Sequence, residues 1–289
     1  MNRATMQRIH FYKMTGTGND FVMIDNRKGL IDSEHCQEFV RLVCRHKLSV
    51  GADGVILIEN DSEVDFRWRF FNADASEAEM CGNGARCAAR FAFLTGIVDR
   101  PRMAFRTLAG IIKAELLDKK VKVQMPVPHS LSMNLKIETS GRFFDLDFIN
   151  SGVPHAVCFM ADEKELEEAD IAGWGRALRY NPHFQPAGTN VDFVCVQDKQ
   201  HIIVRTYERG VEGETLACGT GAIASALISA ARDLAASPVE VRVRSGELLT
   251  IYFQASPGSG NPGDIQFKEV YLEGEARVAY EADLWPETI

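Results

Sequence analysis

The stretches "EMCGNGARC" (residues 79–87) and "LACGTGAIA" (residues 216–224) share one arrangement, a cysteine followed by Gly-x-Gly-Ala and a run of small residues. A second pair of segments, "TGNDFV" (17–22) and "TNVDFV" (189–194), occurs in the same order, and we align their asparagines with each other. Internal similarity of this kind is typical of a fold built from repeated units. The sequence therefore predicts two structurally similar halves, each with a turn followed later by a helix that begins at a cysteine.

A cysteine in the first turn of a helix lies at the positive end of the helix dipole. This position favours the thiolate, so we expect the pKa values of Cys81 and Cys218 to be lowered from the usual ~8.5. The residues that follow each cysteine present backbone N–H groups without an intrahelical partner, and such groups bind carboxylates. Each copy is therefore expected to place a basic or nucleophilic sulfur beside a cradle for a carboxylate.

Two such copies facing one substrate would place a sulfur on either side of the carbon next to the bound carboxylate. Inverting the α-carbon of an amino acid requires a base on one face and an acid on the other. The alternative for either copy alone is a tightly packed core helix that happens to begin with a buried cysteine. The match between the two copies favours the interpretation as a proton-transfer pair.

Composition and charge limit the classes of function. The chain has 289 residues, of which 46% are hydrophobic and 25% are charged, as is typical of a globular protein with a substantial core. The net charge of −8 argues against binding to nucleic acid or to an anionic membrane. No apolar run reaches transmembrane length and the first residues lack a signal-peptide core, so we expect a cytoplasmic protein with no membrane partner.

The seven cysteines do not form a metal-binding or disulfide pattern. Their number is odd, no Cys-x-x-Cys or His-Glu-x-x-His motif occurs, and a chain of this length does not need disulfides. We therefore expect no metal site. Cys36 and Cys44 fall in "SEHCQEFVRLVCRHK" (33–47), which we interpret as an amphipathic helix capped by Ser33, with both thiols acting as small buried hydrophobes.

The remaining pattern predicts short strands in two β-rich halves. "DFRWRFFN" (65–72) alternates aromatic and charged residues as a half-buried strand does, and Gly96 is expected to end the helix that follows Cys81. The prolines of "MPVPHS" (125–130) suggest a domain crossing near residue 125. We expect an N-terminal half at 1–125 and a C-terminal half at 126–272, with a strand in 273–289 returning to the first half. The other expected elements are strands at 9–25, 54–59, 103–108, 111–117, 120–125, 143–152, 155–160, 191–196, 201–208, 239–244 and 248–253, a helix start at 162–170, a loop at 255–264 and a strand-like tail at 269–284.

Three motifs closely resemble those of the diaminopimelate epimerase family, "TGTGNDFVMID" (15–25), "FNADASEAEMCGNGARC" (71–87) and "YERGVEGETLACGTGA" (207–222). The resemblance runs from about residue 9 to residue 280. It implies an α/β (α+β) fold of two pseudo-symmetric domains, each a mostly antiparallel, barrel-like sheet around a central helix, with the active site between them. It also implies a cofactor-independent isomerase that interconverts LL- and meso-diaminopimelate in lysine and peptidoglycan precursor synthesis.

The resemblance also assigns roles to individual residues. It implies that Cys81 and Cys218 are the acid–base pair and that His155 and Glu208 tune the two thiols. Arg209 would help to recognise a charged end of the substrate, as a guanidinium that can bind a carboxylate through two hydrogen bonds. The full set of implied substrate contacts is Asn19, Asn72, Gly82, Asn83, Asn190, Glu208, Arg209, Gly219 and Thr220.

The chain departs from the family pattern at three places. Val153 stands where many members carry an asparagine, and Gly54 stands near the position of a glutamine in some members. The segment "VEGE" (211–214) is one residue longer than in some relatives. These differences concern the fit of the substrate and not the two thiols.

Three other interpretations compete with this one. A proline or hydroxyproline racemase would also use two thiols, but it would have little use for Asn72, Asn190 and Arg209. A redox switch would use Cys81 and Cys218 as a reversible disulfide and would exchange no protons with an amino acid. A pyridoxal phosphate enzyme would need a lysine and a phosphate loop, neither of which we find in a convincing context. The oligomeric state stays open, with a homodimer as one option.

Overall fold

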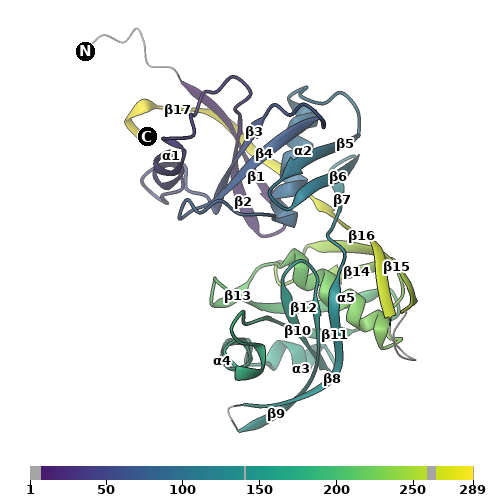
Figure 1. Cartoon of the computed structure of the whole chain (residues 1–289). Coiled ribbons are helices and arrows are strands. Elements are labelled where there is room, and N and C mark those ends of the chain that lie inside the picture. Colours follow the sequence, from purple (N-terminus) through teal and green to yellow (C-terminus); the bar gives the residue numbers. More distant parts are fainter. Residues whose placement is uncertain (1–7, 140, 259–264, 289) are drawn as a thin grey trace. The chain divides into compact units, whose positions relative to one another are not determined.

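The computed structural model describes residues 8–139, 141–258 and 265–288, which form two compact units (Figure 1). Unit 1 comprises residues 1–123 and 274–289, and unit 2 comprises residues 124–273. Each unit is a mostly antiparallel sheet with few helices, as the family resemblance implied.

In unit 1, the hydrogen-bonded strand order is β17-β1-β2-β3-β4-β5-β6-β7. The pairs β2–β3 and β4–β5 are parallel and the others are antiparallel. Helix α1 connects the first parallel pair and helix α2 connects the second. The bounds are β1 Ile9–Gly16, β2 Asn19–Asp25, α1 Cys36–Val43, β3 Gly54–Glu59, β4 Phe66–Asn72, α2 Gly82–Leu94, β5 Arg102–Thr107, β6 Gly110–Leu117, β7 Lys120–Gln124 and β17 Arg277–Leu284.

Helix α2 is the central helix of unit 1. It packs against β1, β2, β3 and β6, so strands from distant places in the sheet order reach the same helix. Small side chains let these strands approach, and residues 83–89 of the helix are all buried. Gly96 ends the helix as expected, with φ +69° and its N–H bonded to the carbonyl of Phe93.

Unit 2 repeats this topology. Its strand order is β8-β9-β10-β11-β12-β14-β15-β16, with the short β13 paired to β12. The pairs β10–β11 and β12–β14 are parallel. The bounds are β8 His129–Thr139, β9 Arg142–Asn150, β10 Pro154–Met160, α3 Glu163–Glu168, α4 Ile171–Arg179, η1 Pro182–Phe184, β11 Asn190–Val196, β12 His201–Glu208, β13 Gly213–Thr215, α5 Gly219–Ala231, β14 Val239–Arg242, β15 Leu248–Pro257 and β16 Ile265–Glu275; η2 Pro286–Thr288 follows β17 near the end of the chain.

Helix α5 is the central helix of unit 2. It packs against β9, β10, β11, β12, β14 and β15, and residues 221–229 are all buried. An apolar layer on the other face of the sheet includes Phe193 and Leu146 from the strands and Leu166 and Leu178 from α3 and α4. In unit 1, Cys36 and Cys44 lie in the corresponding layer beside α1, which confirms their interpretation as buried hydrophobes.

The matching topology corrects one part of the repeat. The cysteines precede equivalent helices, α2 and α5, as expected. The two asparagines are not equivalent, because Asn19 begins β2 whereas Asn190 begins β11, which takes the place of β3. The register shows that the counterpart of Asn190 is Gly54, since Gly54 pairs with Phe21 of β2 and Asn190 pairs with His155 of β10.

Several expected elements differ in detail. Ser33 does not cap α1, whose N-cap is His35, and its hydroxyl instead accepts a hydrogen bond from Arg69. Strands β8 and helix α4 were not expected. The expected loop at 255–264 is wrong at its start, because β15 continues to Pro257, and residues 259–264 lie outside the described part of the chain. The tail forms two strands, β16 paired with β15 and β17 paired with β1.

Candidate functional site

Each of the two motif cysteines is the N-cap residue of a central helix. Cys81 and Cys218 both have extended backbone conformations, and their carbonyls accept the first helical hydrogen bonds, from Ala85 and Ala222. Helix geometry leaves the N–H groups of Gly82 and Gly219, and of the residues after them, without intrahelical partners. In both units, therefore, a cysteine sulfur lies beside backbone N–H groups that have no intrahelical partner, as the sequence predicted.

The surroundings of the two sulfurs differ. The Sγ of Cys81 accepts a hydrogen bond of 3.4 Å from the N–H of Gly84, and its side chain is partly exposed. The Sγ of Cys218 lies 3.4 Å from the Oγ1 of Thr220, and the residue is only 8% exposed.

The expected lowering of the pKa of Cys218 is wrong. Burial raises the pKa of this thiol well above its ordinary value, and the negative charges of Glu208 and Asp192 raise it further. Desolvation of a buried group disfavours its charged form, and here it outweighs the helix dipole. Cys218 is therefore a protonated thiol, suited to donate a proton.

In unit 1, Asn19 and Asn83 belong to one network behind Cys81. The amide of Asn83 donates to the Oδ1 of Asn19 at 2.7 Å and to the carbonyl of Thr17 at 3.2 Å. Its own oxygen accepts from the buried guanidinium of Arg86 at 2.9 Å. Asn19 donates in turn to Asp53 at 3.0 Å. These bonds fix the loop after β1 against the first turn of α2.

Asn72 lies at the exposed end of β4. Its amide donates to the hydroxyl of Ser76 at 3.0 Å, within the turn that leads toward Cys81. Glu208 lies at the corresponding end of β12, because β4 and β12 are equivalent strands that both precede a cysteine-led helix. The negative charge of Glu208 raises the pKa of the Cys218 thiol.

Asn190 and Arg209 are held together in unit 2. The backbone N–H of Arg209 donates to the Oδ1 of Asn190 at 2.8 Å, and the Asn190 amide donates to the carbonyl of Pro154 at 3.0 Å. The guanidinium of Arg209 donates to the carbonyl of Ala187 at 2.7 Å. Asn190 is 2% exposed, so its amide positions the backbone at the end of β12.

His155 is completely buried and links Asp192 to Thr220, which contacts Cys218. Its Nδ1 lies 2.7 Å from the Oδ2 of Asp192, and its Nε2 lies 2.9 Å from the Oγ1 of Thr220. Thr220 in turn contacts the sulfur. The structure thus groups His155, Asn190, Glu208, Arg209, Cys218, Gly219 and Thr220 in unit 2.

Asp192 is a residue of this cluster that the sequence analysis missed. Its Oδ1 also accepts a hydrogen bond of 2.7 Å from Thr206, and both residues are almost fully buried. The available signal was an aspartate in the otherwise apolar run "VDFVCV" (191–196), since a buried carboxylate requires a specific partner.

Two of the three departures from the family pattern, at Gly54 and Val153, have structural consequences. A Cβ at Gly54 would lie 2.4 Å from the carbonyl oxygen of Phe71 and 2.7 Å from the ring of Phe70, so this position cannot carry a glutamine without rearrangement. Val153 precedes His155 by two residues, as Asn19 precedes Phe21, so an apolar side chain takes the place that an asparagine holds in unit 1.

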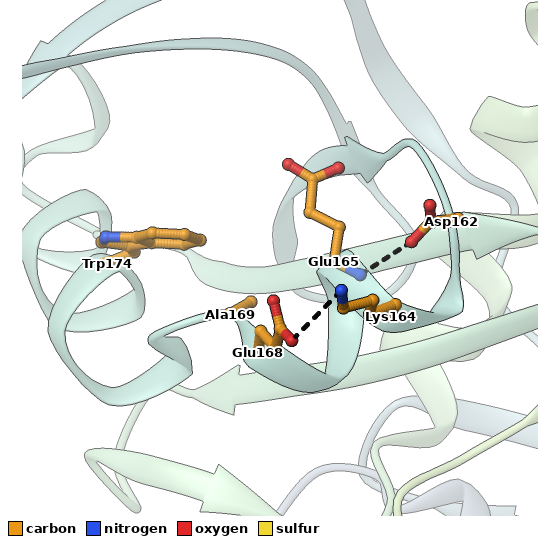
Figure 2. A pocket seen from close by; sticks show the side chains of 6 residues that line it. All are labelled: Asp162, Lys164, Glu165, Glu168, Ala169 and Trp174. Atoms are coloured by element: carbon orange, nitrogen blue, oxygen red, sulfur yellow. Dashed lines mark hydrogen bonds and ion pairs between the residues drawn. The ribbon is translucent and has the colours of Figure 1, made fainter.

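A shallow pocket on the outside of unit 2 is formed by α3, α4 and the turn before them (Figure 2). It is lined by Asp162, Lys164, Glu165, Glu168, Ala169 and Trp174, none of which is a candidate site residue. Its acidic groups already have local roles, because Asp162 caps α3 and Glu168 pairs with Lys164 at 4.0 Å.

Metal sites and membrane-spanning helices are both absent from the described ranges 8–139, 141–258 and 265–288. No group of three or more His, Cys, Asp and Glu side chains in these ranges could hold a metal ion. No helix in the described part of the chain has the length and apolar character needed to cross a bilayer.

Comparison with known proteins identifies the family. The family model "Diaminopimelate epimerase" matches residues 11–130 and 148–264. Diaminopimelate epimerase of Aquifex aeolicus is 45% identical over 97% of this chain and 99% of its own length. That of Hydrogenobaculum sp. is 46% identical over 94% of this chain and 97% of its own length.

Solved structures at lower identity share the fold. A hydroxyproline epimerase from Agrobacterium vitis matches with a TM-score of 0.71 at 16% identity, over 98% of this chain and 94% of its own. A PhzF-family protein from Bacillus anthracis matches with a TM-score of 0.71 at 14% identity, over 97% of this chain and all of its own. The sequence matches, the two-unit fold and the pair of N-cap cysteines lead to one conclusion: the chain belongs to the diaminopimelate epimerase family.

Proposed function

We propose that this protein interconverts LL- and meso-diaminopimelate without a cofactor, by transferring protons at one α-carbon through Cys81 and Cys218. One thiolate removes the α-proton from one face and the other thiol delivers a proton to the opposite face. The residues 1–125 and 126–272 contribute one thiol each. As a step toward lysine and peptidoglycan precursors, the reaction would take place in the cytoplasm.

The observation that carries this proposal is the matched position of the two cysteines. Each precedes a buried helix whose first N–H groups have no intrahelical partner, and such groups bind a carboxylate and stabilise the negative charge that develops as the α-proton leaves. Gly82 and Asn83 in one unit, and Gly219 and Thr220 in the other, supply these donors.

The two sulfurs have different resting protonation in this proposal. Cys218 is the acid because burial and nearby carboxylates raise the pKa of its thiol. When Cys218 donates the proton, Cys81 is the thiolate that removes the α-proton from the opposite face. In the reverse direction the roles exchange, because the product is formed with the sulfurs in the opposite protonation states.

Substrate recognition is assigned to the polar ends of strands β4 and β12. Asn72 and Glu208 occupy these ends, and Arg209 follows Glu208 with a guanidinium that can bind a carboxylate through two hydrogen bonds. Diaminopimelate has an ammonium and a carboxylate at both ends, which gives this set a purpose that a proline substrate would not.

The test is an assay with purified protein, reductant and LL-diaminopimelate, with no cofactor added, followed by separation of the stereoisomers. We expect meso-diaminopimelate to accumulate until both isomers are present in comparable amounts. Proline and hydroxyproline serve as matched controls and should not be racemised. Turnover of proline but not of diaminopimelate would replace the proposal with a proline racemase function.

A further inference from the structure

The strands beneath α5 carry a buried polar network next to Cys218, at positions that are apolar in unit 1. The strand registers define the equivalence. Phe21 pairs with Gly54 and His155 pairs with Asn190, so Phe21 corresponds to His155. Ile56 lies two residues after Gly54 on β3 and pairs with Phe70 of β4. Asp192 lies two residues after Asn190 on β11 and pairs with Thr206 of β12. The set Phe21, Ile56 and Phe70 is thus replaced in unit 2 by His155, Asp192 and Thr206.

The glycines of the two motifs support this equivalence independently. A Cβ at Gly84 in α2 would lie 3.0 Å from the Cδ1 of Ile56. A Cβ at Gly221 in α5 would lie 2.3 Å from the Oδ1 of Asp192. The third residue after each cysteine therefore faces the same place in its unit, once an aliphatic side chain and once a carboxylate.

A buried polar set is costly unless all its groups are paired, so its presence in only one unit needs a reason. Here the pairing is complete. Asp192 accepts from the Thr206 hydroxyl at 2.7 Å and bonds His155 Nδ1 at 2.7 Å, and His155 Nε2 bonds Thr220 at 2.9 Å. His155 and Asp192 are both 0% exposed.

The donors and acceptors fix the protonation of this network. An ionised carboxylate only accepts hydrogen bonds, so His155 carries its proton on Nδ1. The amide nitrogen of Asn190 is a donor and faces Nε2 at 3.4 Å, so we take Nε2 to be an acceptor in the resting network. The Thr220 hydroxyl therefore donates to Nε2, which leaves the Thr220 oxygen free to accept from the thiol of Cys218 at 3.4 Å.

We propose that Asp192 is a positioning residue that holds His155 as the proton acceptor for Cys218, with Thr220 as the link between them. This inference rests on the proposed function, because it gives the buried thiol a second route to the thiolate besides the transfer of its proton to the substrate. The proton on Sγ moves to the Thr220 oxygen while the Thr220 proton moves to His155 Nε2. The products are a thiolate, an intact threonine and an imidazolium paired with the Asp192 carboxylate, and no other reactant is needed.

The proposal predicts an effect opposite in sign to that of simple charge repulsion. The charged groups that act on the Cys218 thiol are Glu208 at the end of β12 and Asp192 on β11, and Asp192 also raises the pKa of the buried Cys158 thiol on β10. As a mere nearby charge, Asp192 would suppress the Cys218 thiolate. As the partner of His155, it also stabilises the imidazolium and the thiolate that forms with it, and this effect outweighs the direct repulsion between Asp192 and the thiolate.

The experiment measures alkylation of Cys218 by iodoacetamide at pH 7 in the full chain, with peptide mass spectrometry and with Cys81 as the internal reference. In Asp192→Asn we expect the ratio of Cys218 to Cys81 labelling to fall by about tenfold, because the amide cannot stabilise an imidazolium. An increased ratio would mean that Asp192 acts only as a repelling charge, and an unchanged ratio would mean that it has no net effect on the Cys218 thiolate. Either result would overturn the proposal.

A second pair of variants keeps the test decisive if Asp192→Asn fails to fold. Thr220→Ser retains the hydroxyl and should keep the wild-type labelling ratio within about twofold, whereas the isosteric Thr220→Val should lose about tenfold, as expected for an interrupted proton path. Equal ratios in the two variants would contradict the relay. Labelling does not depend on turnover, so a wild-type protein that fails to epimerise diaminopimelate would reject the proposed function without deciding this test.

Discussion

Cys218 shows how burial and a helix dipole compete at one side chain. The dipole favours the thiolate, but it acts on a residue that is only 8% exposed and whose sulfur is influenced by two carboxylates. Sequence reasoning identified the dipole because the position of a cysteine before a helix is local information. It could not identify the opposing effect, because Asp192 and the strands that bury the sulfur are distant in sequence.

The two cysteines should be individually indispensable. We expect Cys81→Ala and Cys218→Ala each to lower the epimerisation rate by at least about 100-fold, as is typical when a general acid or base is lost. The control is Cys36→Ala, which removes a buried thiol from the first residue of α1 and should leave the rate unchanged at a temperature where the variant is folded. Circular dichroism melting would show that all three variants remain folded.

Loss of one sulfur should leave the chemistry of the other intact. Elimination of a β-halogen from an analogue requires a base on one face only, so each alanine variant should still eliminate from the stereoisomer whose α-proton faces its remaining cysteine. Appreciable epimerisation by either variant would refute the assignment of two bases.

The seven thiols should differ in reactivity in a defined order. Burial raises the pKa of Cys44 and of Cys87 to about 12, so both stay protonated at pH 8. Cys81 is partly exposed and should react first with iodoacetamide, followed by Cys218. Because the pKa of Cys218 is raised, its labelling should continue to increase as the pH rises beyond 9, which a time course by mass spectrometry would show. Labelling of Cys87 before Cys218 would contradict this order.

At the scale of elements, the strands with strict alternation were the predictable ones. Phe66, Trp68 and Phe70 are buried in β4 while Arg67 is exposed, as the sequence indicated. Strand β8 was missed because only one of its eleven residues is buried, so burial imposes almost no pattern on it. After β10 the sequence predicted only the start of one helix, at 162–170. The structure has two short helices there, because Asp162 caps α3 and Asp170 caps α4.

The first turns of α2 and α5 should respond differently to an added methyl group. Gly221→Ala would place Cβ 2.3 Å from a carboxylate oxygen of Asp192 and 3.1 Å from the Thr206 hydroxyl, so we expect a loss of about 1–3 kcal/mol in unfolding free energy. In Gly84→Ala the Cβ would lie 3.0 Å from the flexible end of Ile56 and at 3.4 Å or more from Trp68 and Cys81, so this change should cost less. Urea denaturation of both variants measures the difference, and a more damaging Gly84→Ala would show that the Asp192 network can shift freely.

At the scale of the whole molecule, the two units share one topology but not one chemistry. Both present a cysteine before a buried helix, which the sequence repeat revealed because the motifs are contiguous. The repeat could not reveal which strands are equivalent, since Asn19 and Asn190 occupy similar motifs on non-equivalent strands. The strands beneath α2 are apolar where those beneath α5 carry the network of His155, Asp192 and Thr206. Only the strand registers reveal this difference.

Proton transfer through two thiols needs neither an electron sink nor a Lewis acid. We expect the epimerisation rate to be unchanged, within about 20% as the ordinary scatter of such assays, after dialysis against EDTA and without pyridoxal phosphate. Reductant should be needed, because oxidation of either thiol removes an acid or a base. A loss of activity that zinc or pyridoxal phosphate restores would show that the thiols are not sufficient.

The most direct test of the two-thiol mechanism is the early phase of the reaction of LL-diaminopimelate in heavy water. Two bases predict that the first meso-diaminopimelate formed carries one deuterium at the inverted carbon, because its new hydrogen comes from a thiol that has exchanged with solvent. Over the same interval, the unreacted LL isomer should remain largely unlabelled. Early meso product that retains the original hydrogen would mean that one group both removes and returns the proton, and would contradict the assignment of Cys81 and Cys218 as an opposed pair.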